Sequence, residues 1–231
     1  MKIFVHGVPD TSALWIPLLQ ELQLSSEDFR TLSLPGFGCS RPNDFSSTME
    51  CYADWLIQQI QLISQECKAP IDLIGHDWGA ILSTRAASLR PDLIKSLAIG
   101  GAAIDASYRG HLLAWLWSTP LIGELIMNLL TASQLQKTLE KQGMEKNLAA
   151  VEASALTSEM KSSIISLYRS AAGLRSLGKW EDKLFNLPEK MILIWGEKDP
   201  YVSLSTAKKF AANWGGKLHI ENNMGHWAMA I

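Results

Sequence analysis

The stretch Ile-Asp-Leu-Ile-Gly-His-Asp-Trp-Gly at residues 71–79 says more about the fold than any other part of the chain. A short apolar run, Ile71–Ile74, leads into two glycines that flank Asp77, and a helical pattern starts at Trp78. This succession of strand, sharp turn and helix is the setting in which a catalytic nucleophile is lifted to the edge of a sheet. The helix N-terminus favours a negative charge at the tip of the turn. Taken alone, Gly-x-Asp-x-Gly more often marks an ordinary turn, so the prediction depends on the rest of the sequence.

Around this stretch, short apolar runs alternate with helical stretches, which is typical of parallel strands joined by crossover helices. The expected strands are Lys2–Val5, Phe29–Leu34, Ile71–Ile74, Ile94–Ile99, Met191–Trp195 and Lys217–Ile220. The expected helices are Ser12–Leu22, Met49–Cys67, Trp78–Leu89 and Ser205–Trp214. The sequence therefore predicts the α/β class, with a mostly parallel sheet flanked by helices.

Residues 105–183 interrupt this alternation with a long helical stretch that contains no expected strand. An insertion at the carboxyl ends of the strands would roof the place where open α/β sheets bind ligands. The predicted division of the chain is therefore a core formed by residues 1–104 and 184–231, with residues 105–183 as a helical insertion.

Length and composition favour one globular domain with a buried core, since the 231 residues are 47% hydrophobic and 19% charged. The formal net charge of −2 provides no basic stripe for nucleic acid, and nothing in the charge balance favours a membrane surface. The apolar stretch Leu112–Leu130 contains Pro120 and Glu124, so we expect two short helices there rather than one spanning helix.

The cysteines and the first residues indicate a cytoplasmic protein. Cys39, Cys51 and Cys67 are odd in number and lack metal-site spacing, which is typical of reduced thiols. Residues 1–7 run directly into the first expected strand without an apolar targeting segment. No metal cluster or cofactor-binding loop is expected, and the oligomeric state stays open.

Three further signals follow other expected strands in the order that a nucleophilic site on this kind of sheet requires. His6-Gly7-Val8-Pro9 follows the first strand, and its loop can aim the Val8 N–H beside the Trp78 N–H as a two-donor anion hole. Asp199 follows the next-to-last strand, and His226 lies in the loop after the last one. Because the chain order is nucleophile, acid and histidine, we predict a catalytic set of Asp77, Asp199 and His226.

In combination these motifs resemble the α/β-hydrolase superfamily, in the branch of epoxide hydrolases and haloalkane dehalogenases. The resemblance spans nearly the whole chain and is carried by residues 6–9, 34–40, 75–80, 195–199 and 225–227. It implies an α/β-hydrolase fold in which residues 105–183 form the helical cap. Members of the family usually have two more strands before the first strand seen here and a helix after the histidine. The resemblance therefore implies a sheet of about six strands, an exposed edge at Phe29–Leu34 and looser packing around the histidine loop.

The resemblance also implies roles for single residues. Asp77 matches the nucleophile, Asp199 the acid that orients the histidine, and His226 the base that activates water. Val8 and Trp78 match the anion-hole positions. Tyr168, within Leu167-Tyr168-Arg169-Ser170, resembles a cap tyrosine that donates a proton to an epoxide oxygen.

An aspartate nucleophile suits displacement at a saturated carbon, because it gives an alkyl ester that water can reopen. His226, neutral and held by Asp199, would remove a proton from the water that attacks this ester. The predicted activity is a hydrolase that acts through a covalent ester on Asp77. Its expected partners are a small hydrophobic substrate and water.

The leaving group stays open between two kinds. An epoxide oxygen needs a proton donor, for which Tyr168 is the first candidate and Tyr108 the second. A halide needs N–H donors, for which Trp78 could be joined by Trp115 or Trp117. Most tryptophans in such segments belong to the core, so epoxide hydrolysis ranks slightly above haloalkane dehalogenation. An ester or lactone hydrolase and a catalytically weak, ligand-binding member of the fold are two more candidate functions.

Overall fold

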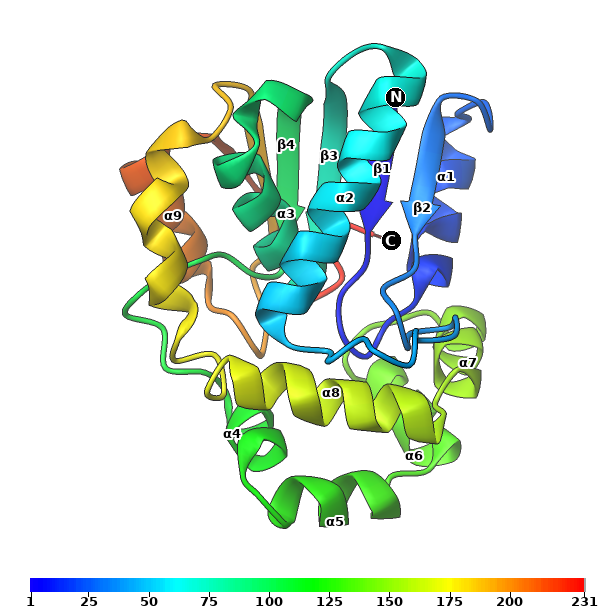
Figure 1. The fold of residues 1–231 in the computed structure, drawn as a ribbon. Coiled ribbons are helices and arrows are strands. Elements are labelled where there is room, and N and C mark those ends of the chain that lie inside the picture. Colours follow the sequence, from blue (N-terminus) through cyan, green and yellow to red (C-terminus); the bar gives the residue numbers. More distant parts are fainter. Residues whose placement is uncertain (231) are drawn as a thin grey trace.

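A six-stranded parallel sheet forms the centre of the computed structural model, which describes residues 1–230 (Figure 1). The strand order is β2-β1-β3-β4-β5-β6, and every pair of neighbours runs parallel. The strands are β1 (Lys2–Val5), β2 (Phe29–Leu32), β3 (Ile71–His76), β4 (Ile94–Gly100), β5 (Met191–Gly196) and β6 (Lys217–Glu221). The predicted α/β class and six-stranded sheet are confirmed, and β2 lies at an edge of the sheet as expected.

The connections between strands cover the sheet with helices. Helices α2 and α3 pack against each other on one face, α1 lies behind strand β2, and α9 packs against β5 and β6 (Figure 1). The helices of this layer are α1 (Ile16–Leu22), α2 (Met49–Cys67), α3 (Trp78–Leu89) and α9 (Leu204–Trp214), with the short 3-10 segments η1 (Ser12–Trp15), η2 (Pro91–Leu93) and η3 (Leu177–Asn186).

Two element boundaries differ from the sequence prediction for local reasons. The single helix expected over Ser12–Leu22 divides into η1 and α1, because Pro17 lacks an N–H and favours the first turn of a new helix. The strand expected to reach Leu34 ends at Leu32. Leu34 leaves the ladder because its N–H donates to the His6 ring instead, at 3.0 Å.

Strand β3 and helix α3 hold the turn between them in the middle of the core. Ile71 and Leu73 on β3 are fully buried, and nearly every residue of α3 is buried. Packing on all sides leaves few alternative positions for the turn at Asp77. This central strand and helix therefore give the candidate site a rigid base.

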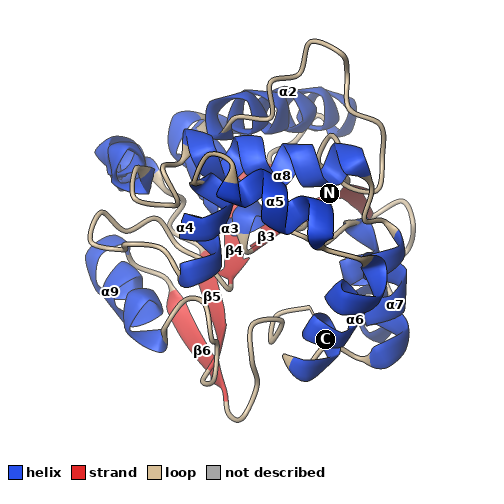
Figure 2. Cartoon of the chain, turned by 90° about the horizontal axis from the view of Figure 1, so that it is seen from below, coloured by secondary structure: helices blue, strands red, loops and turns tan. Residues whose placement is uncertain are grey.

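Five helices connect β4 to β5 and lie beyond the carboxyl ends of the strands (Figure 1). They are α4 (Leu112–Ser118), α5 (Ile122–Leu129), α6 (Ala132–Lys141), α7 (Lys146–Ser154) and α8 (Ser158–Ser170). Viewed from below, α4, α5 and α8 lie over β3 and β4, while α6 and α7 stand to one side, near the last described residues (Figure 2). Leu135 and Leu139 of α6 pack in one buried cluster with Trp227 and Met229.

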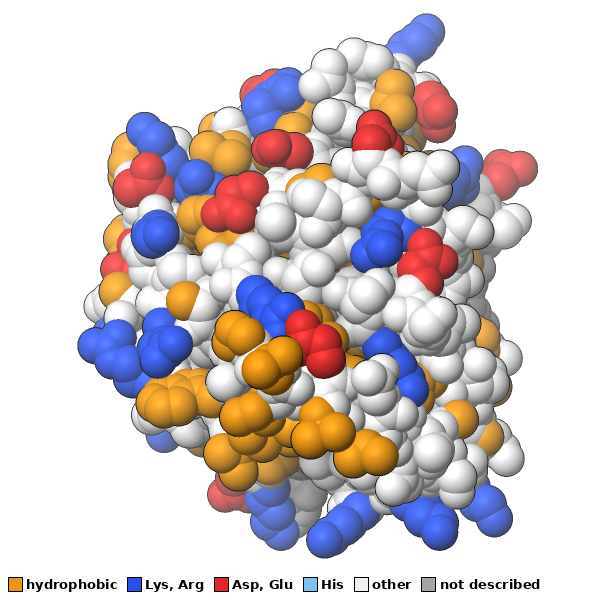
Figure 3. Space-filling model, turned by 60° about the horizontal axis from the view of Figure 1, so that its bottom comes forward, with side chains coloured by type: hydrophobic (Ala, Val, Ile, Leu, Met, Phe, Trp, Pro, Cys, Tyr) orange, Lys and Arg blue, Asp and Glu red, His pale blue; other side chains and the backbone are white. Residues whose placement is uncertain are grey.

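The outer side of α4 and α5 exposes a group of large apolar side chains, seen as an orange area in Figure 3. Its members are Leu112, Trp115, Leu121, Ile122, Leu125 and Leu129. Within residues 1–230, no single helix is long and apolar enough to cross a bilayer. Helices α4 and α5 reach that length and composition only as a pair, and they bend by 108° where they meet.

Candidate active site

Asp77 lies at the tip of the turn between β3 and α3, in a backbone conformation that residues with a side chain rarely adopt. Its φ is 51° and its ψ is −123°, and such strain is typical of functional turns. The glycines on either side permit the tight packing that holds the turn. A Cβ on Gly79 would lie 2.1 Å from the Val5 carbonyl oxygen, and one on Gly75 would lie 2.4 Å from the Gly79 oxygen.

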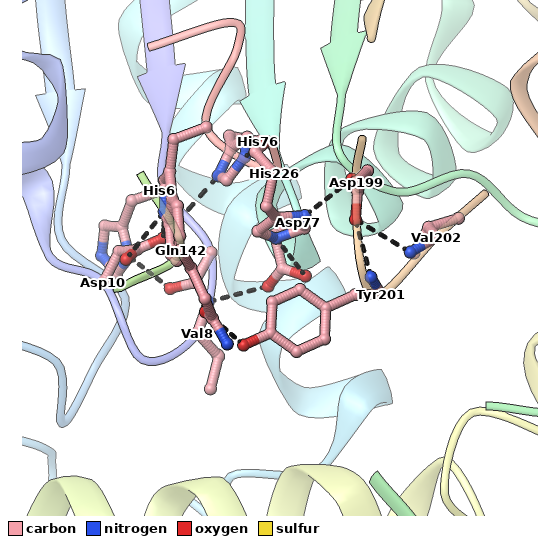
Figure 4. A network of polar contacts seen from close by, with 12 residues as sticks. His6, Val8, Asp10, His76, Asp77, Gln142, Asp199, Tyr201, Val202 and His226 are labelled. Carbon is pink, nitrogen blue, oxygen red and sulfur yellow. Dashed lines mark hydrogen bonds and ion pairs between the residues drawn. The ribbon is translucent and has the colours of Figure 1, made fainter. Parts of the chain in front are cut away.

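Three side chains from different parts of the chain meet at this turn (Figure 4). Nε2 of His226 lies 3.5 Å from Oδ2 of Asp77, and Nδ1 of His226 lies 2.8 Å from Oδ2 of Asp199. The other oxygen of Asp199 accepts the backbone N–H groups of Tyr201 and Val202, at 2.8 and 3.0 Å. The structure thus brings the three predicted triad residues into one line, with Asp199 fixed behind the imidazole.

The two carboxylates change the protonation of His226. Burial by itself lowers the pKa of His226, but the charge of Asp199 and the hydrogen bonds to Asp199 and Asp77 raise it well above its ordinary value. Burial alone would raise the pKa of Asp77, yet the hydrogen bond and charge of His226 hold it below the usual range. The directions of these two pKa shifts favour an imidazolium between two carboxylates in the resting site. The neutral His226 predicted from the sequence concerns the later step, in which water attacks the ester.

The loop after β1 approaches Asp77 from the opposite side. The backbone N–H of Val8 donates to Oδ1 of Asp77 at 2.9 Å. Residue 7 must be a glycine for this approach, because a Cβ there would lie 2.4 Å from the Cβ of Asp77. The backbone N–H of Trp78 is the first of helix α3 and has no carbonyl acceptor within the helix. Of the two predicted anion-hole positions, Val8 thus donates to the Asp77 carboxyl group, and Trp78 follows Asp77 directly as the first residue of α3.

A cavity of about 200 Å³ lies between this group and helices α4–α6 and α8. Asp77 and His226 reach its floor, and its walls are mainly apolar. The residues that line it are Val8, Pro9, Asp77, His111, Leu113, Trp117, Ile126, Met127, Leu130, Leu135, Thr138, Leu139, Gln142, Ile164, Tyr168, Tyr201, His226 and Trp227. The shape and composition suit a small hydrophobic molecule held above a few polar groups. In residues 1–230, no three His, Cys, Asp or Glu side chains gather in a way that could hold a metal ion.

Among the residues predicted to bind the leaving group, Tyr168 contacts both Trp78 and Trp117. Tyr168 lines the cavity, and its ring meets those of Trp78 and Trp117 edge to face, with centroids 5.6 and 5.0 Å apart. Burial and then the charge of Asp77 raise the pKa of Tyr168 well above its usual range, although the Trp78 N–H opposes this. The indole N–H of Trp78 is buried and has no hydrogen-bond partner of ordinary geometry within residues 1–230.

The structure does not bring the two other candidates to the cavity. Trp115 is 47% exposed on the outer side of α4, and its indole N–H donates to the Arg109 carbonyl oxygen at 2.6 Å. The hydroxyl of Tyr108 donates to the carbonyl oxygen of Tyr201 at 2.9 Å, behind the cavity wall. Both predictions are corrected, because the relevant donor of each residue is already bound to the backbone.

Four polar residues of the cavity were not predicted from the sequence: His111, Thr138, Gln142 and Tyr201. The ring of Tyr201 meets that of His226 edge to face, with centroids 4.9 Å apart, and the Tyr201 hydroxyl donates to the side-chain oxygen of Gln142 at 2.5 Å. His111 lies beside Tyr201, with centroids 5.0 Å apart. Only Tyr201 carries a sequence signal, since it comes two residues after the predicted acid Asp199. His111, Thr138 and Gln142 belong to the insertion, whose helices could not be placed over the sheet from their pattern alone.

A second buried polar network supports the histidine loop from behind. Nε2 of His76 donates to the carbonyl oxygen of His226 at 2.9 Å, and Nδ1 of His76 lies 3.7 Å from Asp10. Asp10 also accepts the indole N–H of Trp227. Glu152 of α7 reaches the same region and accepts the backbone N–H of Thr11 at 2.7 Å. The insertion is thus tied to the core directly behind the candidate site.

Glu152 gives this network a pH dependence. Burial and the charge of Asp10 raise the pKa of Glu152 from 4.5 to about 8. Between these values the unfolded chain releases the proton that the folded chain retains, so the free energy of unfolding falls as the pH rises. Glu152→Gln should remove this dependence, because glutamine keeps the acceptor for Thr11 and has no proton to lose.

Thermal unfolding midpoints measured from pH 5 to pH 8 test this expectation. The wild-type midpoint should fall across this range more steeply than that of Glu152→Gln. The exposed Glu66→Gln serves as the control and should follow the wild type. Parallel curves for the wild type and Glu152→Gln would show that Glu152 is ionised in the folded chain.

Comparison with known proteins agrees with this arrangement of sheet, turn and helices. The sequence pattern of the alpha/beta hydrolase fold family matches residues 3–230. Epoxide hydrolase 3 of Xenopus tropicalis is 26% identical in an alignment that covers 98% of this chain and 66% of that protein. The (E)-2-((N-methylformamido)methylene)succinate hydrolase of Acinetobacter baylyi is 28% identical over 42% of this chain and 35% of that protein. The chain thus spans less than two thirds of the length of these curated relatives.

Solved structures show the same fold. The haloalkane dehalogenase of Bradyrhizobium elkani USDA94 superposes with a TM-score of 0.75 at 22% identity, over 98% of this chain and 83% of that one. Since the family pattern also runs over nearly the whole chain, the protein belongs to the alpha/beta hydrolase fold family.

Proposed function

We propose that this protein is a hydrolase that forms a covalent alkyl ester on Asp77, and that its substrates are small hydrophobic epoxides. One observation carries the proposal: the Asp77 carboxylate stands on a strained turn at the floor of an apolar cavity, 3.5 Å from Nε2 of His226. A carboxylate placed in this way suits attack on a saturated carbon. The likeness to an epoxide hydrolase over 98% of the chain supports the same assignment.

The proposed reaction has two steps. In the first, an oxygen of Asp77 attacks an epoxide carbon, the carbon–oxygen bond breaks, and the ring oxygen takes the proton of the Tyr168 hydroxyl. In the second, His226 removes a proton from water, which adds to the ester carbonyl carbon of Asp77. The N–H groups of Val8 and Trp78 hold the resulting oxyanion. Collapse releases the diol, whose leaving oxygen takes the proton from His226. The carboxylic acid left on Asp77 then passes its proton to His226, which restores the imidazolium, and the proton that His226 released before the second step restores Tyr168.

The first step would itself convert His226 into a base. In the resting site the charges of Asp199 and Asp77 both favour the imidazolium. Ester formation removes the charge of Asp77, so the pKa of His226 must fall towards that set by burial and Asp199 alone. Proton release then leaves a neutral imidazole beside the ester, at the stage where a base is needed. The ion pair of the resting site is therefore consistent with the proposed order of steps.

In this proposal residues 105–183 act as a cap that supplies the substrate-facing wall. Helices α4, α5, α6 and α8 contribute Trp117, Met127, Leu139, Ile164 and Tyr168 to the lining. A closed apolar wall excludes bulk water, which strengthens the polar interactions at the cavity floor. The contact of Glu152 with the loop after β1 would fix the cap relative to the nucleophile.

Removing the Tyr168 hydroxyl should cost most of the epoxide activity. Tyr168→Phe is expected to lower kcat/KM for styrene oxide by about 10²–10⁴-fold, the usual contribution of a positioned proton donor. The ring contacts with Trp78 and Trp117 remain, so the fold should persist. Tyr108→Phe is the matched control, because the Tyr108 hydroxyl is bound behind the cavity wall. Equal losses in both variants would exclude Tyr168 as the donor.

Haloalkane dehalogenation is the second candidate, because Trp78 directly follows Asp77 and its buried indole N–H has no hydrogen-bond partner of ordinary geometry within residues 1–230. Such a donor could hold a departing halide, with Trp117 as its neighbour in the cavity lining. Diol formation from styrene oxide and bromide release from 1-bromobutane, measured in parallel, separate the two activities. We expect diol formation to dominate, and bromide release alone would assign the protein to the second class.

A further inference from the structure

The six exposed apolar side chains on the outer side of α4 and α5, called the α4–α5 patch below, have no role in the two proposed steps. Leu112, Leu121 and Leu129 are 74, 82 and 67% exposed. In Figure 3 the members form one orange area rather than separate spots. Single exposed apolar side chains are common, but a contiguous group of them is typical of a binding surface.

The same two helices are apolar on their inner side as well. Trp117 of α4 and both Ile126 and Met127 of α5 line the cavity. A helix that is apolar on all sides is normally buried on all sides. Packing within residues 1–230 covers only the inner side, so the outer side is suited to an apolar environment that the chain itself does not supply.

The polar groups of α4 and α5 favour lipid over a protein as the source of this environment. The hydroxyls of Ser118 and Thr119 both donate to the Trp115 carbonyl oxygen, at 2.9 and 2.8 Å, and Glu124 pairs with Arg169 at 2.6 Å. Protein interfaces usually contain about one hydrogen bond for every 100–200 Å², and leucine is rare among their strongest contacts. The patch offers mainly leucine, and α5 is the helix farthest from the sheet in Figure 1. A protruding aliphatic surface of this kind suits insertion among acyl chains.

Positive charge beside the patch points to lipids with a negative charge. The indole N–H of Trp115 donates to the carbonyl oxygen of Arg109, and the guanidinium carbon of Arg175 lies 5.0 Å from the centre of the Trp115 ring. In residues 1–230 the two guanidinium groups donate only to backbone carbonyl oxygens. Glu124 is the only acidic residue among residues 106–139, so the net charge of −2 arises elsewhere in the chain and does not describe this face. Tryptophan and arginine side by side are typical of the boundary between water and lipid.

Helices α4 and α5 are suited to lying on a bilayer. They have seven and eight residues, so each is about 10–12 Å long, whereas the hydrocarbon layer is about 30 Å thick. The bend of 108° between them gives the pair no common axis along which to cross. Insertion to the boundary between headgroups and acyl chains is the depth that interfacial helices reach.

We propose that the α4–α5 patch docks this protein on the surface of an anionic phospholipid bilayer. The exposed leucines insert among the acyl chains, Trp115 lies at the level of the headgroups, and Arg109 and Arg175 contact the lipid phosphates. The inference does not depend on the proposed epoxide reaction, because it concerns the outer side of the cap and not the cavity.

Sedimentation with vesicles tests the insertion of the leucines. The unmodified protein should pellet with vesicles of phosphatidylcholine that contain about one third phosphatidylserine. The double variant Leu125→Gln, Leu129→Gln should bind them about 10²-fold more weakly, roughly tenfold for each apolar side chain that no longer leaves water. Glutamine is a good helix former and neither leucine lines the cavity, so the fold should persist. Leu62→Gln is the matched control, because Leu62 of α2 is 54% exposed and Leu125 60%, and it should bind like the parent.

Arg109→Gln with Arg175→Gln tests the charge. Binding to the phosphatidylserine vesicles should weaken by about fivefold for each arginine removed. Binding to vesicles of phosphatidylcholine alone should be weak in the parent and unchanged in this variant, because those vesicles carry no net charge. An equal loss on both kinds of vesicle would contradict the role given to the two arginines.

Three results would overturn the inference. The first is a parent protein that pellets with neither kind of vesicle. The second is an equal loss of binding in Leu62→Gln and in the double leucine variant, which would make the attachment non-specific. The third is a dimer, seen by sedimentation velocity without lipid, that the double leucine variant dissolves, because a second copy of the chain would then cover the patch. Styrene oxide hydrolysis without vesicles is measured separately, so a failure of the proposed function would not be mistaken for any of these results.

The fluorescence of Trp115 shows which face meets the lipid. Trp115 is the only tryptophan in residues 1–230 that is largely exposed. Phosphatidylcholine brominated on the acyl carbons close to the headgroup quenches indoles that lie beside it. Vesicles of this lipid with phosphatidylserine should therefore quench the parent protein more than Trp115→Phe. Equal quenching of the two proteins would show that a different face lies on the bilayer.

Discussion

His226→Gln should stop turnover after the first step, so that protein alkylated on Asp77 accumulates. Glutamine retains a hydrogen-bonding group beside Asp77 but has no basic nitrogen to remove a proton from water. Steady-state diol formation is therefore expected to fall by about 10⁴-fold or more, as for the loss of a triad histidine. Ester formation needs no base, so one equivalent of styrene oxide should still react. Mass spectrometry of the intact protein should show this adduct, and peptide mapping should place it on Asp77.

The adduct also distinguishes the proposed enzyme from a catalytically weak, ligand-binding relative. His219→Gln is a suitable control, because His219 lies on edge strand β6, away from the cavity. This variant should turn over normally and accumulate no adduct. A His226→Gln protein that binds styrene oxide but never gains its mass would favour a ligand-binding function.

Asp77→Asn should lose activity at the first step. A neutral amide is a far weaker nucleophile than a carboxylate, so kcat/KM for epoxides is expected to fall by about 10⁴-fold. No burst of substrate consumption should precede the steady state. Substrate binding should persist, because the cavity wall is unchanged and asparagine still accepts the Val8 N–H.

The matched control for this variant is Asp72→Asn, on the same strand but at its opposite end. Asp72 accepts a hydrogen bond from the Ser96 hydroxyl at 2.7 Å and takes no part in the cavity. It should retain full activity. If Asp77→Asn still hydrolysed an aryl ester at the wild-type rate, water activated by His226 would act directly. An ester or lactone hydrolase would then replace the epoxide proposal.

The arrangement of the core was predictable because its signals are local. Each strand of the sheet appears as a short apolar run, and the motifs at Val8, Asp77, Asp199 and His226 directly follow such runs. The carboxyl ends of parallel strands meet at one edge, so strand order alone brings these residues near one another. The differences lie at element ends, where Pro17 restarts a helix and the His6 ring captures the N–H of Leu34.

The cap side of the cavity was less predictable, because it depends on contacts between distant segments. Trp115 and Trp117 stand two positions apart on one short helix, so they point to different sides. Trp117 reaches the cavity and Trp115 reaches the surface, but the sequence offered no way to choose between them. His111 reaches the cavity as the N-cap of α4, so its place likewise requires the exact start of this helix, and helix ends are the least certain feature of a sequence pattern.

The charge of His226 in the resting site was not predictable from the sequence, for a related reason. The sequence indicates one acidic partner for the histidine, whereas the structure places a carboxylate at each ring nitrogen, at 2.8 and 3.5 Å. Two anions on one buried ring favour the imidazolium, even though burial opposes it. The charge of a buried group depends on all of its neighbours, and those distances exist only in the folded chain.

The origin of the oxygen added to the product tests the nucleophile most directly. A single turnover of styrene oxide, with protein in excess and in water enriched in the heavy oxygen isotope, separates the two routes. Attack by Asp77 predicts a first-turnover diol without label and one labelled oxygen in the peptide that contains Asp77, because water enters at the ester carbonyl carbon. A labelled diol together with an unlabelled Asp77 peptide would show that water attacks the substrate itself, and would contradict the covalent ester.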